Sequence, residues 1–309
     1  MGRKGVECAK AWSPAGLSAI FEAVVVEGDP MRSGARGAGL ALEKGVTVEV
    51  CTSSDKEYQI FLNGVPGDYN VARLAALEVA KLVGYAGGLT IRQEVEVPIG
   101  GGLGTSGASA LAVSLATAKL LGLKASYTTI ARIAHKVEVE AGTGLGTVSG
   151  LAVGGACIVL EPGPPGSDKV DRILLPQDMV VVIGFFGPIR KSSVLRSTSL
   201  SVINKLGRGY VEKLALEPLI ENMLDYSKMF SLEAGLATEN VKRTYRTLEK
   251  EGVPHVGQAM VGDTVFTVVK EEEAGKVSKI LESIGAKTLV SKISWKPAIL
   301  LTSQRIYDE

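Results

Sequence analysis

The chain has 309 residues, which is enough for two domains of ordinary size. Its 34 Lys and Arg residues nearly balance 33 Asp and Glu residues, and a net charge of +1 does not favour binding to nucleic acid or to an anionic membrane. Glycine accounts for 37 residues, more than the usual share of about 7% would give, so the positions of the glycines are informative.

The three cysteines, Cys8, Cys51 and Cys157, are far apart, and no two of them form a Cys-x-x-Cys pair. We therefore expect neither a disulfide framework nor a structural zinc site, and a reducing cytoplasm fits best. The N-terminus lacks the apolar stretch of a signal peptide. Two uncharged stretches, 97–118 and 141–160, are rich in Gly, Ser and Thr, so we expect buried turns rather than membrane spans.

In chain order, apolar runs and alternating patterns predict strands in the first half of the sequence at 23–27, 46–50, 58–62, 90–97 and 156–160. Helical spacing predicts helices at 70–83, at 106–121, and from an N-cap at Ser126 to about residue 140. Asn63-Gly64 lies between apolar segments and predicts a tight hairpin.

The stretch EPGPPGSDK, residues 161–169, is the clearest boundary signal, and it predicts an N-terminal domain, 1–165, and a C-terminal domain, 166–309. Beyond it we expect an α+β arrangement with βαβ character. Its expected strands are 179–184, 264–270 and 298–303, with helical segments in 199–251 and a helix at 272–284.

The glycine-rich segment 98–110 reads PIGGGLGTSGASA, with a strand that ends at Pro98 and a helix that begins near Ser106. Backbone N–H groups in such a loop can converge on an anion, and the helix dipole adds positive potential. Part of the segment matches G-x-G-x-x-G, but a second helix follows where a dinucleotide-binding unit needs a strand. The Lys of a Walker A loop is absent. A tightly packed turn without a ligand stays the alternative.

The next predicted helix carries an acid at the edge of its apolar face. Glu138 at this edge can reach a polar cavity as a Mg²⁺ ligand would, and His135 lies on the same side. A second glycine loop, 142–150, follows directly, so the two loops predict two walls of one cleft. An exposed acid and a structural histidine stay the alternatives. Segment 32–39 adds Arg36 in a predicted basic loop; arginine commonly binds carboxylates, although such a loop is more often simply solvated.

These motifs resemble those of the GHMP kinase superfamily, small-molecule kinases that use ATP. Its second motif, P-x-x-x-G-L-G-S-S-A, is similar to residues 98–108, with Thr for the first Ser and Gly before the Ala. The first motif, a turn after an N-terminal strand, resembles segment 11–16 (AWSPAG), and the third resembles segment 257–262 (GQAMVG).

The resemblance implies an α+β, two-domain GHMP kinase fold, with an N-terminal domain like ribosomal protein S5 domain 2 and a C-terminal ferredoxin-like α/β sandwich. Within the superfamily, the chain most resembles the archaeal pantoate kinases, through segments 36–39, 134–138, 144–146 and 257–260. This implies transfer of the γ-phosphate of ATP to the primary hydroxyl of pantoate, giving 4-phosphopantoate for coenzyme A synthesis. Alternatives are other acceptors (mevalonate, its phosphates or homoserine), a catalytically weak nucleotide-binding regulator, and a structural module.

The resemblance also implies site residues. Those expected to bind ATP are Pro98, Gly100, Gly101, Gly102, Leu103, Gly104, Thr105, Ser106, Gly107 and Ala108. Ser106 and Glu138 are expected to hold Mg²⁺, and His135 to line the acceptor pocket. Charge and loop position alone suggest that Arg36, Arg190 and Arg196 bind the acid group. A homodimer is common in the family.

The sequence departs from the family pattern at three places. Thr147 stands where the family usually has Asp, Gly16 where many members have His, and no Arg occurs in 156–160. The family Asp is the candidate base for the substrate hydroxyl, and threonine cannot take that proton at neutral pH. General-base help is typically worth about 10²–10⁴-fold, so we expect a slower reaction rather than none.

Overall fold

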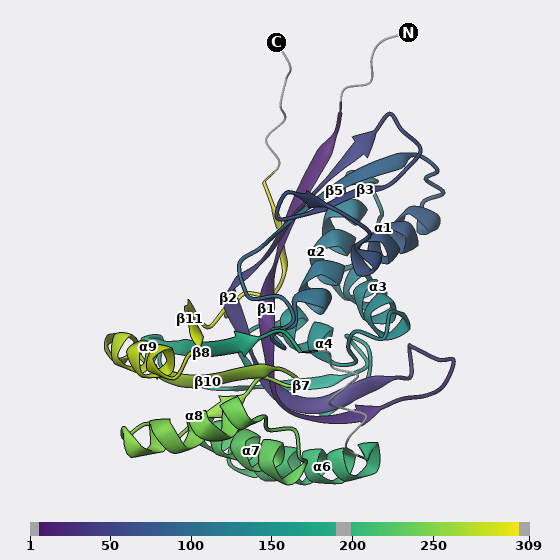
Figure 1. The fold of residues 1–309 in the computed structure, drawn as a ribbon. Helices are drawn as coiled ribbons and strands as arrows, with labels where there is room; N and C mark the ends of the chain where they lie inside the picture. The colour runs from purple at the N-terminus through teal and green to yellow at the C-terminus, as the bar shows by residue number, and fades with distance from the viewer. Residues whose placement is uncertain (1–5, 190–198, 303–309) are drawn as a thin grey trace.

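The computed structural model describes residues 6–189 and 199–302, which form two β-sheets with helices packed against them (Figure 1). In this described part, the larger sheet has eight strands and the smaller has four. The larger sheet contains β1 (Cys8–Val24), β2 (Gly34–Ser53), β3 (Gln59–Leu62), β4 (Val65–Pro66), β5 (Gly88–Val95), β6 (Ala156–Glu161), β7 (Lys169–Ile173) and β12 (Ile299–Leu301). The smaller contains β8 (Met179–Gly187), β9 (Gly257–Gln258), β10 (Asp263–Lys270) and β11 (Lys287–Lys292).

The helices fall into two groups along the chain. The first group is α1 (Asn70–Leu82), α2 (Thr105–Leu120), α3 (Tyr127–Glu140) and α4 (Thr147–Val153). The second is α6 (Leu200–Leu216), α7 (Ile220–Glu233), α8 (Glu239–Lys250) and α9 (Ala274–Ser283), with a 3₁₀ turn, η1 (Glu271–Glu273), before α9. Figure 1 shows the first group beside the long strands of the larger sheet, and α6, α7 and α8 together at the lower end of the molecule.

β1 and β2 form the long antiparallel centre of the larger sheet. Their register runs from the pair Cys8–Cys51 at one end to the pair Val24–Gly34 at the other, with two irregularities along β1. β6 pairs with the first half of β2, and β5 pairs with its second half. The long strand β2 therefore joins β6, which pairs near its start, to β5, which pairs near its end.

Two segments that were expected to be a turn and a loop lie inside these strands, so those predictions were wrong. Segment 11–16 belongs to β1, where an irregularity after Pro14 shifts the register without ending the strand. Most of segment 32–39 belongs to β2, where a Cβ on Gly39 would collide with the carbonyl oxygen of Leu17. Glycine in this segment permits close packing of strands rather than an open loop.

Two short-range signals of the first half are confirmed by the structure, whereas the strand predicted at 23–27 overlaps β1 only at Ala23 and Val24. Asn63 and Gly64 have φ values of +47° and +80° and connect β3 to β4, the backbone that a two-residue hairpin requires. The Ser126 hydroxyl accepts a hydrogen bond from the backbone N–H of Thr129, so it caps α3 as expected.

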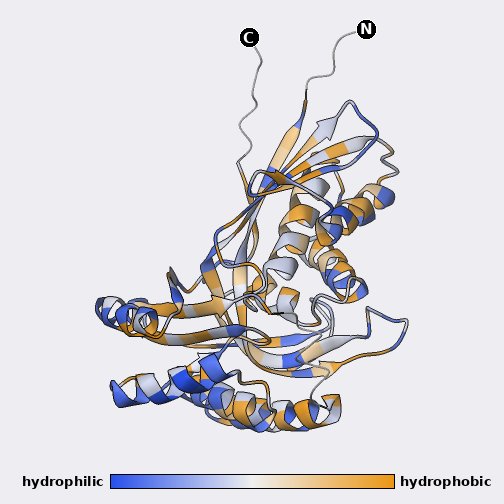
Figure 2. Cartoon of the chain, in the orientation of Figure 1, coloured by the Kyte–Doolittle hydropathy of each residue, from blue (hydrophilic) through white to orange (hydrophobic). Residues whose placement is uncertain are grey.

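Helix α2 lies at the centre of the core around the larger sheet. It packs against β1 and β2 on one side and against α1, α3 and α4 on others, and it is buried along most of its length. Figure 2 shows α2 in pale and apolar colours, whereas α8 is largely hydrophilic. An Ala-rich helix that is apolar on all sides was expected to be buried, and this prediction is confirmed.

The smaller sheet has the order β11-β8-β10-β9 and contains a βαβ unit, in which α9 links β10 to β11. A βαβ arrangement was expected, but with the strand at 298–303 as its last element. Both β10 and β11 pair antiparallel with β8, so they run parallel to each other. The sequence did not predict β11 or β9, because β11 (KTLVSK) has few apolar residues and β9 has only two residues. The predicted strand at 298–303 exists as β12, but it pairs with β1 in the larger sheet.

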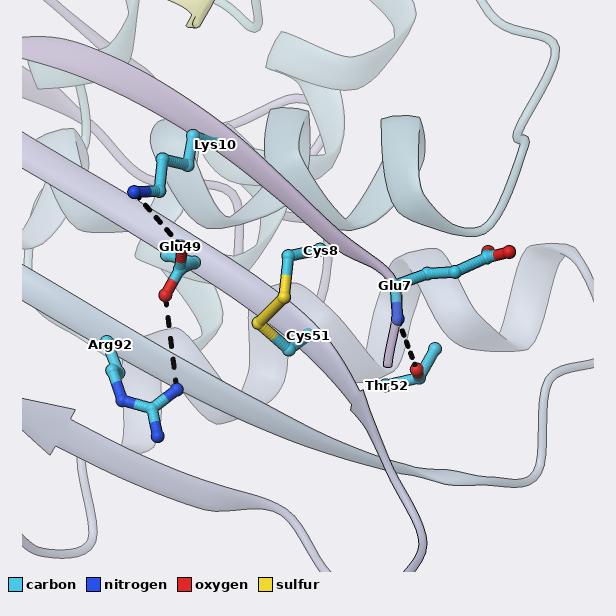
Figure 3. Close-up of a disulfide and its surroundings, with 7 residues drawn as sticks. All are labelled: Glu7, Cys8, Lys10, Glu49, Cys51, Thr52 and Arg92. Atoms are coloured by element: carbon cyan, nitrogen blue, oxygen red, sulfur yellow. Dashed lines mark hydrogen bonds and ion pairs between the residues drawn. A yellow bond between two sulfur atoms is a disulfide. The ribbon is translucent and has the colours of Figure 1, made fainter. Parts of the chain in front are cut away.

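A disulfide joins Cys8 of β1 to Cys51 of β2 (Figure 3). The expectation that the cysteines would stay unpaired was therefore wrong for these two. They are 43 residues apart in sequence, but the antiparallel register places them directly opposite each other. Cys157 is a buried free thiol.

No helix within residues 6–189 and 199–302 combines the length and the apolar character that a bilayer span requires.

Candidate active site

The three segments that resemble the family motifs, 11–16, 98–108 and 257–262, meet where α2 begins, although they are far apart in sequence. The backbone N–H of Gly16, in the first, donates to the carbonyl of Leu103, in the second, at 3.1 Å. A Cβ on Gly102 would lie 2.9 Å from the carbonyl oxygen of Ala259, in the third. The second segment is therefore held between the first and the third.

In the second segment, residues 98–104 form a loop and residues 105–108 form the first turn of α2. Gly104 is the residue before the helix, with φ +59°, and a Cβ there would lie 2.9 Å from the carbonyl oxygen of Gly16. The first turn of α2 carries no acidic side chain, so its N–H groups and the dipole of a 16-residue helix present positive potential at the loop. This geometry fits a polyphosphate. All the residues expected to bind ATP lie in this segment.

Glu138 and the start of α2 are in direct contact. The Glu138 side chain from α3 is buried, and a Cβ on Gly107 would lie 2.9 Å from its Oε1 atom. Gly144 in the second glycine loop is closer still, because a Cβ there would collide with the same carboxylate. Ser106 precedes Gly107, and its Oγ is buried without a hydrogen-bond partner in the described residues. A buried carboxylate and a hydroxyl are oxygen ligands of the kind that Mg²⁺ prefers, so these residues fit that ion.

Thr147, the first residue of α4, packs between these groups through its methyl. That methyl carbon would lie 2.9 Å from a Cβ on Gly104 and 3.0 Å from a Cβ on Gly107. It also lies close to Gly16. The residue at the family Asp position therefore adjoins the loop and the start of α2, but it brings a hydroxyl instead of a carboxylate.

A cavity of about 560 Å³ lies beside these groups: Thr147 lines it, and so does Gly16, which bonds to Leu103, although no residue of 98–108 is among its lining residues. Its lining includes Thr147 and Gly144, residues from the second half of β1 and the first half of β2, and Met260 from segment 257–262. Its walls are mostly apolar, with Leu, Ile, Phe and Val side chains. Among the described residues that line it, Arg36 is the only charged one. The cavity therefore suits a small, largely apolar molecule with one anionic group.

Arg36 lies on β2, not in a loop as expected. Its Nε donates to the carbonyl oxygen of Leu160 at 3.0 Å, and its Nη1 donates to Oε2 of Glu22 at 2.9 Å. Leu160 belongs to β6, the strand on which the family usually has an arginine. The Arg36 guanidinium, on the neighbouring strand β2, thus lies next to the strand that carries the arginine in the family.

His135 is fully buried, and it is not among the residues that line the cavity. Its Nε2 lies 3.0 Å from the carbonyl oxygen of Ser33 and 3.2 Å from that of Pro30. Burial lowers the pKa of His135, although the two carbonyl contacts oppose this shift. Its position indicates that it holds the connection between β1 and β2, and its role toward an acceptor stays a prediction.

Arg190 and Arg196 lie outside the described residues, so their expected role stays untested. Two other residues lie near Arg36 and were not expected there, namely Glu22 of β1 and Arg208 of α6. A signal existed for Glu22, because it interrupts an apolar run (AIFEAVVV) with a charge. No signal paired it with Arg208, which is 186 residues away.

Comparison with known proteins agrees with this geometry. The model of the GHMP kinases N terminal domain matches residues 70–159, from α1 to β6. Over 289 residues the chain is 28% identical to the pantoate kinase of Thermococcus kodakarensis, which covers 92% of this chain and 95% of that protein. A shorter match, 38% identical over 88 residues, is to the homoserine kinase of Pyrococcus horikoshii, and it covers 28% of this chain and 30% of that protein.

The fold has a similar solved structure, a phosphotransferase related to the CoA biosynthesis pathway. The two superpose with a TM-score of 0.85 at 26% identity, and the match covers 95% of this chain and 98% of that one. The expected two-domain GHMP kinase fold is therefore confirmed.

Proposed function

The chain belongs to the GHMP kinase superfamily, and on this premise we propose that it transfers the γ-phosphate of ATP to the primary hydroxyl of pantoate. The observation that carries the proposal is that Thr147 and Gly144 connect an anion-binding loop and a buried acid to an apolar cavity with one arginine. The similarity to pantoate kinases over almost the whole chain supports the same acceptor.

In this mechanism the loop 98–108 and the N-terminus of α2 bind the polyphosphate through backbone N–H groups. Ser106 and Glu138 would hold Mg²⁺, which offsets the negative charge that develops during phosphoryl transfer. The apolar walls of the cavity take the two methyl groups of pantoate, and Arg36 takes its carboxylate. The hydroxyl is thereby directed toward the loop.

No carboxylate stands at position 147 to accept the hydroxyl proton. Phosphoryl transfer through a loose transition state depends mainly on positioning and on charge neutralisation, so the reaction proceeds without a strong base. We expect this chain to be a slow kinase rather than an inactive one.

Homoserine is the second candidate acceptor. The local match to homoserine kinases favours it, and homoserine also carries a hydroxyl and a carboxylate. The cavity opposes it, because homoserine has an ammonium group and no acidic side chain among the described lining residues would pair with that charge.

The test is an assay of the purified chain with ATP, Mg²⁺ and one acceptor at a time. We expect phosphorylated pantoate by mass spectrometry, and much slower turnover of mevalonate or homoserine. Turnover of another acceptor but not of pantoate would replace the substrate. Binding of ATP without turnover of any acceptor would favour a nucleotide-binding regulator.

We also propose a homodimer in the cytoplasm, where ATP is available, and this proposal rests on the family alone. Light scattering on the purified chain tests the dimer.

A further inference from the structure

Glu22 is a buried carboxylate that joins three elements of the fold. Its side chain, on β1, is only 3% exposed. Its Oε2 atom accepts from Nη1 of Arg36, on β2, at 2.9 Å. Its Oε1 atom accepts from Nη2 and Nε of Arg208, on α6, at 2.6 and 3.1 Å. Both oxygens of one acid are thus used to bind two guanidinium groups.

This contact fixes the orientation of Arg36. Glu22 holds one end of the guanidinium and the carbonyl of Leu160 holds Nε, so two directions in its plane are defined. The remaining nitrogen, Nη2, makes no hydrogen bond within the described part of the chain. Because Arg36 lines the cavity, a fixed guanidinium with an unused Nη2 group is arranged to receive an anion there.

The ion pair with Arg208 connects Glu22 to α6, the helix that contributes Leu200 to the cavity wall. Leu200, at the start of α6, lines the cavity. Gly207 packs so closely on β1 that a Cβ would collide with the carbonyl of Phe21, and Arg208 follows it. Glu22 thus bonds to α6 as well as to Arg36, and the close packing of Gly207 on Phe21 also holds α6 against β1.

The charges of Glu22, Arg36 and Arg208 limit which ligands the cavity can bind. Burial alone would raise the pKa of Glu22, but hydrogen bonds from Arg208 and Arg36 outweigh it and lower the pKa, so the group stays ionised. One carboxylate against two guanidiniums leaves a single positive charge. That charge matches one carboxylate and only partly offsets a phosphate or diphosphate group.

We propose that Glu22 is a positioning residue that holds Arg36 for the carboxylate of the acceptor, and that it restricts the site to acceptors with a single carboxylate. This inference rests on the proposed function, because it assumes that the cavity holds the acceptor.

The experiment compares Glu22→Gln, Arg36→Gln and the double variant with wild type. Glutamine keeps the shape of Glu22 but removes the charge that holds the two guanidiniums. We expect Glu22→Gln to raise the KM for pantoate about tenfold or more, with little change in the KM for ATP. In the Arg36→Gln background the same change should add almost nothing, since the anchor is already absent.

Glu49→Gln is the matched control. Glu49 lies on β2 and contacts Lys10 at 3.1 Å and Arg92 at 4.0 Å, but it is not among the residues that line the cavity (Figure 3). The same loss of charge there should leave both KM values unchanged.

A second acceptor separates positioning from a general structural effect. The neutral diol 2,2-dimethyl-1,3-propanediol has a primary hydroxyl and two methyl groups but no carboxylate. Glu22→Gln should leave kcat/KM for this diol near the wild-type value. If Glu22→Gln folds poorly, Glu22→Asp keeps the charge and shortens the reach, and a smaller but selective rise in the KM for pantoate is then expected.

Three results would overturn the proposal: an unchanged KM for pantoate, equal losses with pantoate and with the diol, or additive losses in the double variant. If wild type itself does not turn over pantoate, the substrate assignment fails, and calorimetric binding of pantoate to the same four proteins decides the role of Glu22 separately. Equal pantoate affinity in wild type and Glu22→Gln, or no pantoate binding to either, would then reject it.

Discussion

Gly107 and Glu138 are in contact, so that a Cβ on the glycine would lie 2.9 Å from Oε1 of the acid. The relationship ties the first turn of α2 to the buried carboxylate of α3, and Ser106 lies one residue before the contact.

Gly107→Ala should lower kcat about tenfold or more, because the new methyl must displace Glu138 or Thr147. Steady-state assays with pantoate measure this change. Gly275→Ala in α9 is the matched control, since nothing lies within 4 Å of a Cβ there. Equal rates in the two variants would show that Glu138 tolerates displacement.

Ser106→Ala and Glu138→Gln should each lower kcat on the order of 10²-fold and raise the Mg²⁺ concentration needed for half-maximal activity. Titration of activity with Mg²⁺ checks both effects. Ser114→Ala serves as control, because Ser114 lies farther along the same helix with a hydroxyl that also has no partner in the described residues. Wild-type kcat and Mg²⁺ dependence in both variants would remove the metal site.

Thr147→Asp should raise kcat, because it restores a proton acceptor beside the start of α2. The gain should appear as an acidic limb in the pH profile of kcat that wild type lacks. Thr147→Val keeps the methyl that packs near Gly16 and Gly104, so it should behave like wild type. A lower rate in Thr147→Asp would mean that the hydroxyl of the acceptor lies elsewhere.

The stability of the fold should fall on the acid side because of His135. Its pKa is lowered by burial, so below pH of about 6.5 the unfolded chain binds a proton that the folded chain resists. The contribution is complete above that pH and is lost as the pH falls toward the folded pKa, at no more than about 1.4 kcal/mol per pH unit. Denaturant unfolding of His135→Gln should show a flatter acid side than wild type.

The disulfide should stabilise the fold without affecting catalysis. Typical values predict a loss of about 2–4 kcal/mol on reduction or in a Cys8→Ser, Cys51→Ser double variant. The melting temperature should fall while kcat stays unchanged, because neither cysteine lines the cavity. A reductant should then have no further effect on the double variant. A lower kcat at temperatures where the double variant stays folded would connect this end of the sheet to the site.

Local signals in the sequence predicted most of the elements. The hairpin at Asn63-Gly64, the cap at Ser126 and the buried helix α2 each depend on residues within a few positions of one another. The glycine segment before α2 was found for the same reason. Such local signals do not show which residues contact each other across long separations in the sequence.

The errors come from that omission. The register of β1 and β2 decides that Cys8 meets Cys51 and that Arg36 stands on a strand, and no local pattern contains this register. The bond between Glu22 and Arg208 spans 186 residues and depends on how α6 packs against β1. The sequence shows that Glu22 and Arg208 are charged, but it does not show that they form an ion pair.

Because β12 returns from the far end of the described chain to pair with β1, and β7 follows the expected boundary at residue 165 yet pairs with β6, the smaller sheet is inserted between two strands of the larger one. A fragment truncated at that boundary would leave β1 and β6 with unsatisfied backbone groups along their outer edges. The halves of this enzyme are thus interleaved, and we expect neither to be a self-sufficient folding unit.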